Sequence, residues 1–200
     1  EDSAYHDHEP VFNHLLKTCE IAKREINADF ITNPKAKERF NAYINEEIGK
    51  IKKRDLMMIL AVIHDIGKML IFEDYGKKAS INAMISDGTT RAYGHEYWGS
   101  LIVKEVLKDI SLPEEVLDYL ANGVRLHGVF NNTWQQNRQL NTNELMDLIK
   151  RYAENIHVDE VFNAYCDCFS APPFQEAKPI IIELFNNPDF YSSLKYSIMD

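Results

Sequence analysis

An apolar helix that ends on an imidazole and a carboxylate is the feature that most restricts how this chain can fold. Residues 56–63 read LMMILAVI, and His64 and Asp65 follow directly. Such a run predicts a buried central helix, which we expect over residues 54–65. Burying the polar side chains of His64 and Asp65 at the end of this helix costs free energy unless other groups form hydrogen bonds or ion pairs with them. The fold is therefore expected to bring compensating groups to this point.

Helical periodicity extends over most of the remaining chain, and no segment shows a convincing strand pattern. We expect further helices over residues 11–27, 36–52, 93–108, 111–127, 142–154, 157–169, 175–185 and 191–198. Ser111 and Thr142 are predicted to cap two of them. Residues 69–93 are less regular, and residues 128–141 are predicted to form a polar loop. The chain is thus predicted to be all-α.

Size and charge limit the classes of function. The 200 residues suit one domain, and an apolar fraction of 45% is enough for a sizeable core. There is no run of roughly 18 apolar residues that could span a membrane. The net charge of −9 argues against this chain holding a long nucleic acid by itself through phosphate contacts. A small anionic substrate is compatible with that charge, because bound metal ions can supply positive charge locally.

The cysteines and the start of the chain bear on its location. Cys19, Cys166 and Cys168 are too few and too unevenly spaced for a disulfide framework, which favours a reducing compartment. We interpret Cys166 and Cys168 as small core residues. No signal peptide is visible, so we expect a cytoplasmic protein. The chain begins with Glu1 and not with Met, which leaves open whether it is an excerpt of a longer protein.

Histidines and aspartates recur on the apolar faces of separate predicted helices. Each alone fits a core residue with satisfied hydrogen bonds, but an aspartate on such a face is unusual without a partner. Imidazole nitrogen and carboxylate oxygen are common ligands of divalent metals, so together they favour a metal cluster. We expect Gly67 to give the backbone the freedom that lets neighbouring ligands reach one ion. The candidate ligands are His14, His64, Asp65, His95, His127 and Asp167.

The order of these residues resembles the signature of the HD phosphohydrolase superfamily. His14, His64-Asp65 and Asp167 match its H…HD…D pattern, and HDIGK at residues 64–68 is a frequent form of the central motif. YGHEYWGS and VRLHG resemble the two histidine motifs that lie between. The segment YHDHEPVFNHLLKTCEIA resembles the first motif in HD domains appended to bacterial tRNA nucleotidyltransferases. The likeness covers roughly residues 5 to 170 and is specific for the superfamily, not for a substrate.

The resemblance implies a bundle of helices with a metal site between them. It implies an HD domain over residues 1–170, and we expect residues 171–200 to form a helical extension packed on the same domain. One or two divalent ions (Mn, Fe, Ni, Zn or Mg) are implied. The first would bind His14, His64, Asp65 and Asp167, and a second would bind His95 and His127 with Asp65 as a bridge. Asp65 and Lys68 would be catalytic, with Lys68 on a substrate phosphate.

The resemblance leaves the substrate and the exact role open. We expect a metal-dependent phosphohydrolase that acts on a small phosphorylated substrate, with a nucleotide, a cyclic phosphate or a short nucleic-acid end favoured and no membrane involved. The alternatives are a catalytically silent HD module and an accessory domain of a larger RNA-processing enzyme. Trp134 and Arg138 suit stacking on a base and binding phosphate, although a packed surface tryptophan fits equally well. Glu96 either supports the metal site from behind or is solvated. His6 and His8 are interpreted as a solvated terminus.

Overall fold

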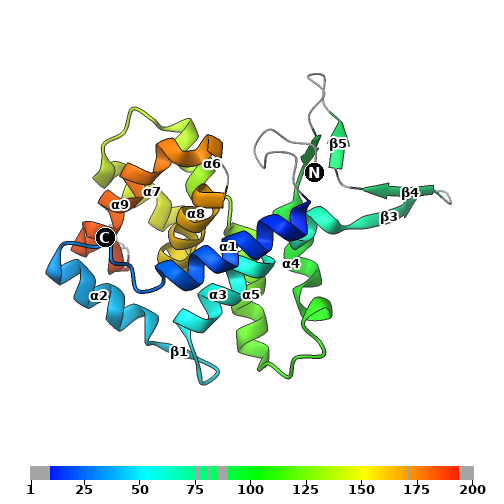
Figure 1. Cartoon of the computed structure of the whole chain (residues 1–200), viewed down its shortest axis with the longest axis horizontal. Coiled ribbons are helices and arrows are strands. Elements are labelled where there is room, and N and C mark those ends of the chain that lie inside the picture. The colour runs from blue at the N-terminus through cyan, green and yellow to red at the C-terminus, as the bar shows by residue number, and fades with distance from the viewer. Residues whose placement is uncertain (1–9, 75–76, 81, 85–89, 171, 194–200) are drawn as a thin grey trace, which may run out of the picture.

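The computed structural model describes residues 10–74, 77–80, 82–84, 90–170 and 172–193. Within them the protein is a bundle of helices with short hairpins, two of which project beside α4 (Figure 1). The helices are α1 (Val11–Glu25), α2 (Pro34–Ile44), α3 (Lys53–Ile63), α4 (His95–Val106), α5 (Glu114–Leu126), α6 (Val129–Gln136), α7 (Thr142–Tyr152), α8 (His157–Ser170) and α9 (Lys178–Asn186). Short 3-10 helices are η1 (Ile66–Met69), η2 (Glu154–Ile156), η3 (Pro172–Ala177) and η4 (Pro188–Tyr191). The all-α prediction is confirmed.

Among the described residues, each strand pairs with the strand next to it in sequence. Antiparallel pairs join β1 (Glu47–Ile48) to β2 (Ile51–Lys52), β3 (Ile71–Asp74) to β4 (Lys77–Ser80), and β5 (Asn82–Met84) to β6 (Thr90–Ala92). The sequence showed no convincing strand pattern, so these hairpins were not predicted. Among the described residues, no helix is both long enough and apolar enough to cross a membrane.

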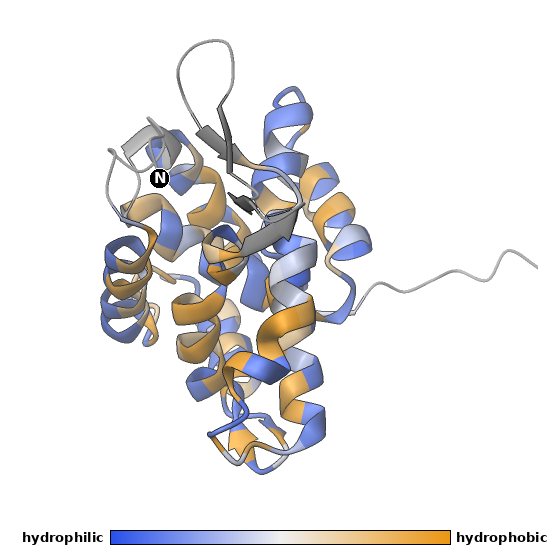
Figure 2. Ribbon diagram, turned by 90° about the vertical axis from the view of Figure 1, so that its right-hand side faces the viewer, coloured by the Kyte–Doolittle hydropathy of each residue, from blue (hydrophilic) through white to orange (hydrophobic). Residues whose placement is uncertain are grey.

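Helix α3 lies between two hydrophobic cores and belongs to both. Leu56, Leu60 and Ile63, spaced by three or four residues, face a smaller core shared with α4 and α5. Met57 and Ala61 face a larger core built on α1, α2, α6, α7, α8 and α9. The hydropathy colouring shows how hydrophobic and hydrophilic residues alternate around most of these helices (Figure 2). Because both sides of α3 are covered, its end is buried, as its apolar sequence predicts.

The predicted helix over residues 36–52 is wrong in its second half. Asn33 caps α2 by accepting hydrogen bonds from the backbone nitrogens of Lys35 and Ala36, but the helix ends at Ile44. Gly49 and Lys50 then both adopt positive φ angles, 56° and 67°. Two such residues form the kind of tight turn that joins paired strands, which explains the β1–β2 hairpin.

The predicted polar loop over residues 128–141 is also wrong, because it contains helix α6. Phe130 and Trp134, four residues apart, face the larger core, and their rings stack with centroids 6.4 Å apart. This pair supplies the apolar side of a helix within an otherwise polar segment. The neighbouring cap is misplaced by one residue, since Asn141 and not Thr142 caps α7, in a capping box with Glu144.

The remaining differences concern helix ends. Pro113, and not Ser111, precedes α5 as its cap residue. Residues 175–185 divide between η3 and α9, and residue 191 ends η4. Most of the helix predicted over residues 191–198, and the histidines at positions 6 and 8, lie outside the described residues. Cys166 and Cys168 are buried in the larger core, as predicted, and so are Ile181 and Phe185 of α9.

Gly67 brings η1 directly against the backbone of α4. A Cβ at Gly67 would lie 2.0 Å from the carbonyl oxygen of His95 and 2.8 Å from the nitrogen of Gly99. A Cβ at Gly99 would lie 3.0 Å from the nitrogen of Gly67. The backbone of Gly67 is not left-handed, so our expectation that it supplies conformational freedom is wrong. Its missing side chain instead sets the distance between the HD motif and the start of α4.

Replacing Gly67 should therefore push α4 away. We predict that Gly67→Ala lowers the free energy of unfolding by about 1–3 kcal/mol, the usual range for overpacking. Ser100→Ala is the control, because that hydroxyl donates a hydrogen bond to the Tyr97 carbonyl within the same helix. Urea unfolding measures both variants. A Gly67→Ala protein as stable as the control would contradict the close approach.

Glu160 is a buried carboxylate on α8. It is 0% exposed, and neither carboxylate oxygen has a hydrogen-bond partner among the described residues. Its neighbour Asp159 is also buried but accepts hydrogen bonds from the hydroxyls of Tyr43 and Tyr119. Burial and the charge of Asp159 raise the pKa of Glu160 well above its usual range, while Arg125 opposes this. The folded protein thus favours the protonated acid.

A raised pKa in the folded state makes stability fall as the pH rises. The stability that protonated Glu160 contributes is fully present below its unfolded pKa of about 4.3. It is lost as the pH rises through the folded pKa. Glu160→Gln cannot ionise, so we predict that it gains roughly 1 kcal/mol or more over wild type at pH 8 and less at pH 5. Urea unfolding at both pH values measures this. Asp159→Asn is the matched control and should destabilise, and an equal gain for Glu160→Gln at both pH values would refute the prediction.

Candidate metal centre

The six predicted ligands come together in one buried place. His14 lies in the first turn of α1, and His64 and Asp65 follow the last turn of α3. His95 begins α4, His127 follows α5, and Asp167 lies in α8. His14, His64 and Asp65 are at most 2% exposed. Side chains from distant parts of the chain therefore meet at the end of α3.

The carboxylate of Asp65 stands between two sets of histidines. Its Oδ2 atom is 3.6 Å from His14 Nε2 and 3.5 Å from His64 Nε2. Its Oδ1 atom is 2.9 Å from His95 Nε2 and 3.3 Å from His127 Nε2. One carboxylate thus presents a different oxygen to each set, so Asp65 could serve as a ligand to an ion held by either set.

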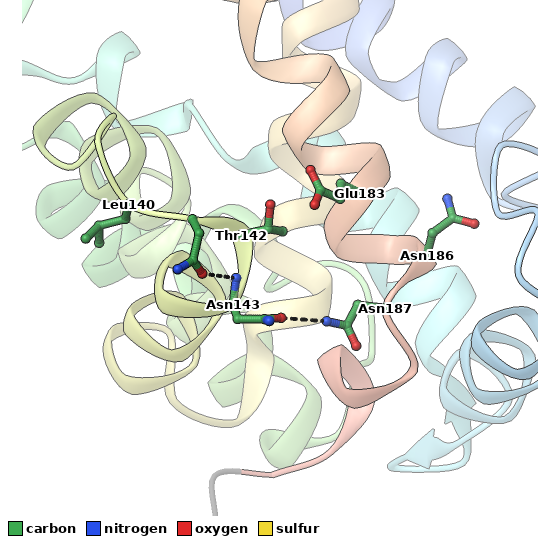
Figure 3. A pocket seen from close by; sticks show the side chains of 7 residues that line it. Leu140, Thr142, Asn143, Glu183, Asn186 and Asn187 are labelled. Atoms are coloured by element: carbon green, nitrogen blue, oxygen red, sulfur yellow. Dashed lines mark hydrogen bonds between the residues drawn. The ribbon is translucent and has the colours of Figure 1, made fainter.

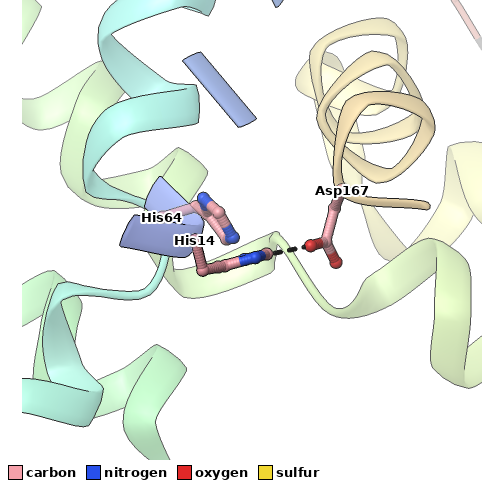
Figure 4. Close-up of side chains that lie close together, drawn as sticks. All are labelled: His14, His64 and Asp167. Atoms are coloured by element: carbon pink, nitrogen blue, oxygen red, sulfur yellow. Dashed lines mark ion pairs between the residues drawn. The ribbon is translucent and has the colours of Figure 1, made fainter. Parts of the chain in front are cut away.

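The side chains form two groups of three whose ligand atoms lie within 4.8 Å of one another. His14, His64 and Asp167 make the first group, and His14 Nε2 lies 3.1 Å from Asp167 Oδ1 (Figure 4). Asp65, His95 and His127 make the second group, where the two Nε2 atoms are 3.1 Å apart. Each group offers the nitrogen and oxygen donors that divalent transition metals prefer.

Backbone carbonyls fix three of the imidazole rings. The Nδ1 atoms of His64, His95 and His127 lie 3.0, 2.7 and 2.7 Å from the carbonyl oxygens three residues earlier in the chain. If Nδ1 carries the proton and donates it there, Nε2 keeps a lone pair that points into the centre. The Nε2 atom of His64 is buried and makes no hydrogen bond within the described part of the chain. The carbonyl contacts at Nδ1 therefore orient these rings so that Nε2 is available as a metal ligand.

Charged and polar neighbours within the centre keep its two carboxylates ionised. Burial alone would raise the pKa of Asp65, but Lys68 and His64 hold it well below the usual range. Burial likewise opposes ionisation of Asp167, yet His14 keeps its pKa low. Burial lowers the pKa of His127, which favours its neutral imidazole, whereas Asp65 outweighs burial at His64 and His95 and raises the pKa of both. Two carboxylates thus share a site with Lys68 Nζ, which is 2.8 Å from Asp65 Oδ2.

The two predicted substrate contacts, Trp134 and Arg138, lie away from the metal centre. Trp134 is 8% exposed and packs in the larger core. Arg138 lies over the Trp134 ring at 4.5 Å and pairs with Glu176. The structure does not bring either residue into the groups around Asp65, and their role in substrate binding stays a prediction. Glu96, in contrast, lies close to the centre. Its Oε2 atom is 3.4 Å from Nδ1 of His95, on the side of the ring opposite Nε2.

Of two pockets in the described part of the chain, one lies near the centre and the other lies away from it. One of about 270 Å³ adjoins the second group and is lined by Glu96, Tyr97, Arg125, Gly128, Val129 and Asn132. The sequence analysis missed it, although Arg125 lies within the VRLHG motif and could have suggested it. The other, of about 530 Å³, lies between α7 and α9 (Figure 3). Its asparagines serve structure: Asn141 caps α7, Asn143 bonds Asn187, and Asn186 holds the backbone at Asn33.

Comparison with protein-family models agrees with this centre. The model of the HD domain matches residues 11–171. The chain belongs to the HD domain family. The HD domain places it in the superfamily of metal-dependent phosphohydrolases, whose members bind divalent metals, and all six candidate ligands lie inside the matched range. A comparison with curated proteins found no match.

The two groups predict how metal content responds to mutation. The protein should hold up to two divalent ions per chain. Asp65→Ala should lose both, because each group shares its carboxylate, whereas His127→Ala should lose only the second. Plasma mass spectrometry after dialysis against Mn²⁺-containing buffer measures the content, and circular dichroism checks the fold.

A buried histidine outside the centre provides the control. His157 Nε2 lies 2.6 Å from the Phe190 carbonyl, so His157→Gln should keep the full metal content. A folded Asp65→Ala protein with full metal content would refute the site. A single ion in the wild type would leave His95 and His127 as substrate contacts.

Proposed function

We propose that this protein is a metal-dependent phosphohydrolase that cleaves a phosphomonoester or phosphodiester bond in a small substrate. Nucleotides, cyclic phosphates and short nucleic-acid ends are the substrate classes we favour. The observation that carries the proposal is Asp65, whose two oxygens face two separate groups of histidines while Lys68 stands beside them. The acidic charge of the chain supports a small substrate over a long nucleic acid.

Phosphoester hydrolysis requires an activated water molecule and relief of charge on the phosphoryl oxygens. Divalent ions held by the two groups would supply Lewis-acid charge to those oxygens and lower the pKa of water. The carbonyl bonds at Nδ1 of His64, His95 and His127 keep the ligand nitrogens oriented. Such fixed geometry avoids the cost of rearranging the site during reaction.

Lys68 contributes a positive charge at a buried position. Its side chain is 8% exposed, and its Nζ atom is held by Asp65 at 2.8 Å. A charge in a low-dielectric site acts more strongly on a nearby phosphoryl oxygen than it would in water. Lys68 is therefore placed to stabilise the charge that gathers on phosphate as the ester bond breaks.

The alternatives differ in whether this chemistry takes place. A silent HD module or an accessory domain of an RNA-processing enzyme could keep the fold and lose the reaction. The complete ligand set favours an enzyme, because a module that has lost the reaction would be expected to lose some of His14, Asp65 and Asp167.

Turnover of simple phosphoesters tests the proposal. The protein should hydrolyse p-nitrophenyl phosphate or its bis ester in Mn²⁺ or Ni²⁺. Lys68→Met should keep the metal and lose about 10²–10³-fold in kcat, the usual effect of removing one charge-stabilising donor. Lys104→Met is the control, since Lys104 is an exposed lysine that pairs with Glu114 and Asp118.

The outcomes separate the alternatives. Metal-loaded protein that turns over neither ester would support the silent module. A Lys68→Met protein that loses its metal would show that the lysine serves the ligands and not the phosphate.

A further inference from the structure

Helix α8 has a polar side, although most of the helix is buried. Its apolar residues pack in the larger core, whereas three of its buried polar residues, Asp159, Glu160 and Asn163, belong to neither hydrophobic core. Glu160 and Asn163 are three residues apart and therefore lie on the same side of the helix. Asp167, four residues after Asn163, continues that side to the metal centre.

Helix α5 packs against this polar side of α8. Tyr119 of α5 donates a hydrogen bond to Asp159, which also accepts one from Tyr43. Burial and the charge of Asp159 raise the pKa of Glu160, and Arg125 of α5 opposes that rise. Glu160 in turn contributes to the raised pKa of Tyr119, after burial and Asp159. The carboxyl of Glu160 therefore lies between α8 and α5, close to residues of both helices.

Glu160 and Asn163 leave three buried oxygen atoms without a partner. Both carboxyl oxygens of Glu160 and the Oδ1 atom of Asn163 make no hydrogen bond within the described part of the chain. An unpaired buried polar group costs free energy, and internal water molecules are the common partners of such groups in folded proteins. A side chain on a helix leans toward the helix start, so the amide of Asn163 leans toward the turn that carries Glu160. Two independent groups thus point to one ligand.

The chemistry of the two groups decides which ligand they suit. Protonated Glu160 has one O–H donor, whereas Asn163 Oδ1 can only accept. A ligand between them must accept from the acid and donate to the amide oxygen, and a water molecule does both. An ammonium ion donates only, and a metal cation would require ionised Glu160, which burial disfavours. The groups therefore suit water and not a cation.

We propose that Glu160 and Asn163 bind one internal water molecule between α8 and α5. The water accepts a hydrogen bond from the acid of Glu160 and donates one to Asn163 Oδ1. It lies about two helical turns before Asp167 on the same side of α8. This site is separate from the proposed phosphohydrolase activity and does not depend on it.

Crystal structures at high resolution test the site directly. In the wild type at pH 6, a water molecule should lie about 2.6–3.2 Å from both the Glu160 carboxyl and Asn163 Oδ1. Asn163→Leu removes the acceptor at similar size and should lose the water. Glu160→Gln keeps a donor and an acceptor and should retain it. Asn143→Leu is the matched control and should also retain it, because Asn143 bonds Asn187 elsewhere in the protein.

A solution measurement gives the same information without crystals of each variant. Nuclear Overhauser effects should connect a long-lived water molecule to the backbone amide protons of Glu160 and Asn163 in the wild type. They should persist in Glu160→Gln and disappear in Asn163→Leu. Glu160→Met should abolish them as well and serves as the second apolar variant if Asn163→Leu does not fold.

Three results would overturn the proposal. The first is a wild-type structure in which the Glu160 acid bonds directly to Asn163 with no water between them. The second is an anomalous peak at this position in crystals soaked in Rb⁺, which would show a cation site. The third is a water that stays in place in both Asn163→Leu and Glu160→Met. Failure of the protein to bind metal or hydrolyse phosphoesters would refute the proposed function and leave this site untouched.

Discussion

The buried carboxylate of Asp65 is the group on which the site depends. It faces His14 and His64 through one oxygen and His95 and His127 through the other, at 2.9 to 3.6 Å. A buried anion of this kind is unfavourable unless cations or donors surround it. The helices that cover both sides of α3 bring those partners from far along the chain. The same contacts that make the anion tolerable therefore create the two candidate metal groups.

The spacing of the two groups depends on the backbone as well as on the ligands. Gly67 and Gly99 let η1 lie directly on α4, and the carbonyl of His95 occupies the place where a Cβ of Gly67 would be. This contact sets where α4 begins relative to Asp65. Lys68, one residue after Gly67, is then carried to the same carboxylate. The short HDIGK motif thus combines ligands, packing and a positive charge.

The candidate site was more predictable from the sequence than the connections around it. Imidazoles and carboxylates on apolar stripes are rare, so His14, His95, His127 and Asp167 could be assigned by periodicity and then matched to the HD motifs. The β1–β2 turn depended on positive φ angles at Gly49 and Lys50, which periodicity does not detect. Helix α6 was missed because Phe130 and Trp134 are isolated among polar residues. Arg125 lies in the VRLHG motif, which could have suggested the pocket, whereas Asn132 carries no pattern and could be placed only from the structure.

The central claim is that Asp65 bridges two metal ions, and anomalous X-ray diffraction from crystals of the Mn²⁺-loaded protein tests it most directly. The account predicts two anomalous peaks about 3.5–4 Å apart, the separation of two-metal hydrolytic sites. One peak should lie among His14, His64 and Asp167, and the other between His95 and His127, each beside a different oxygen of Asp65. A single peak, or none in a folded and metal-saturated crystal, would contradict the account.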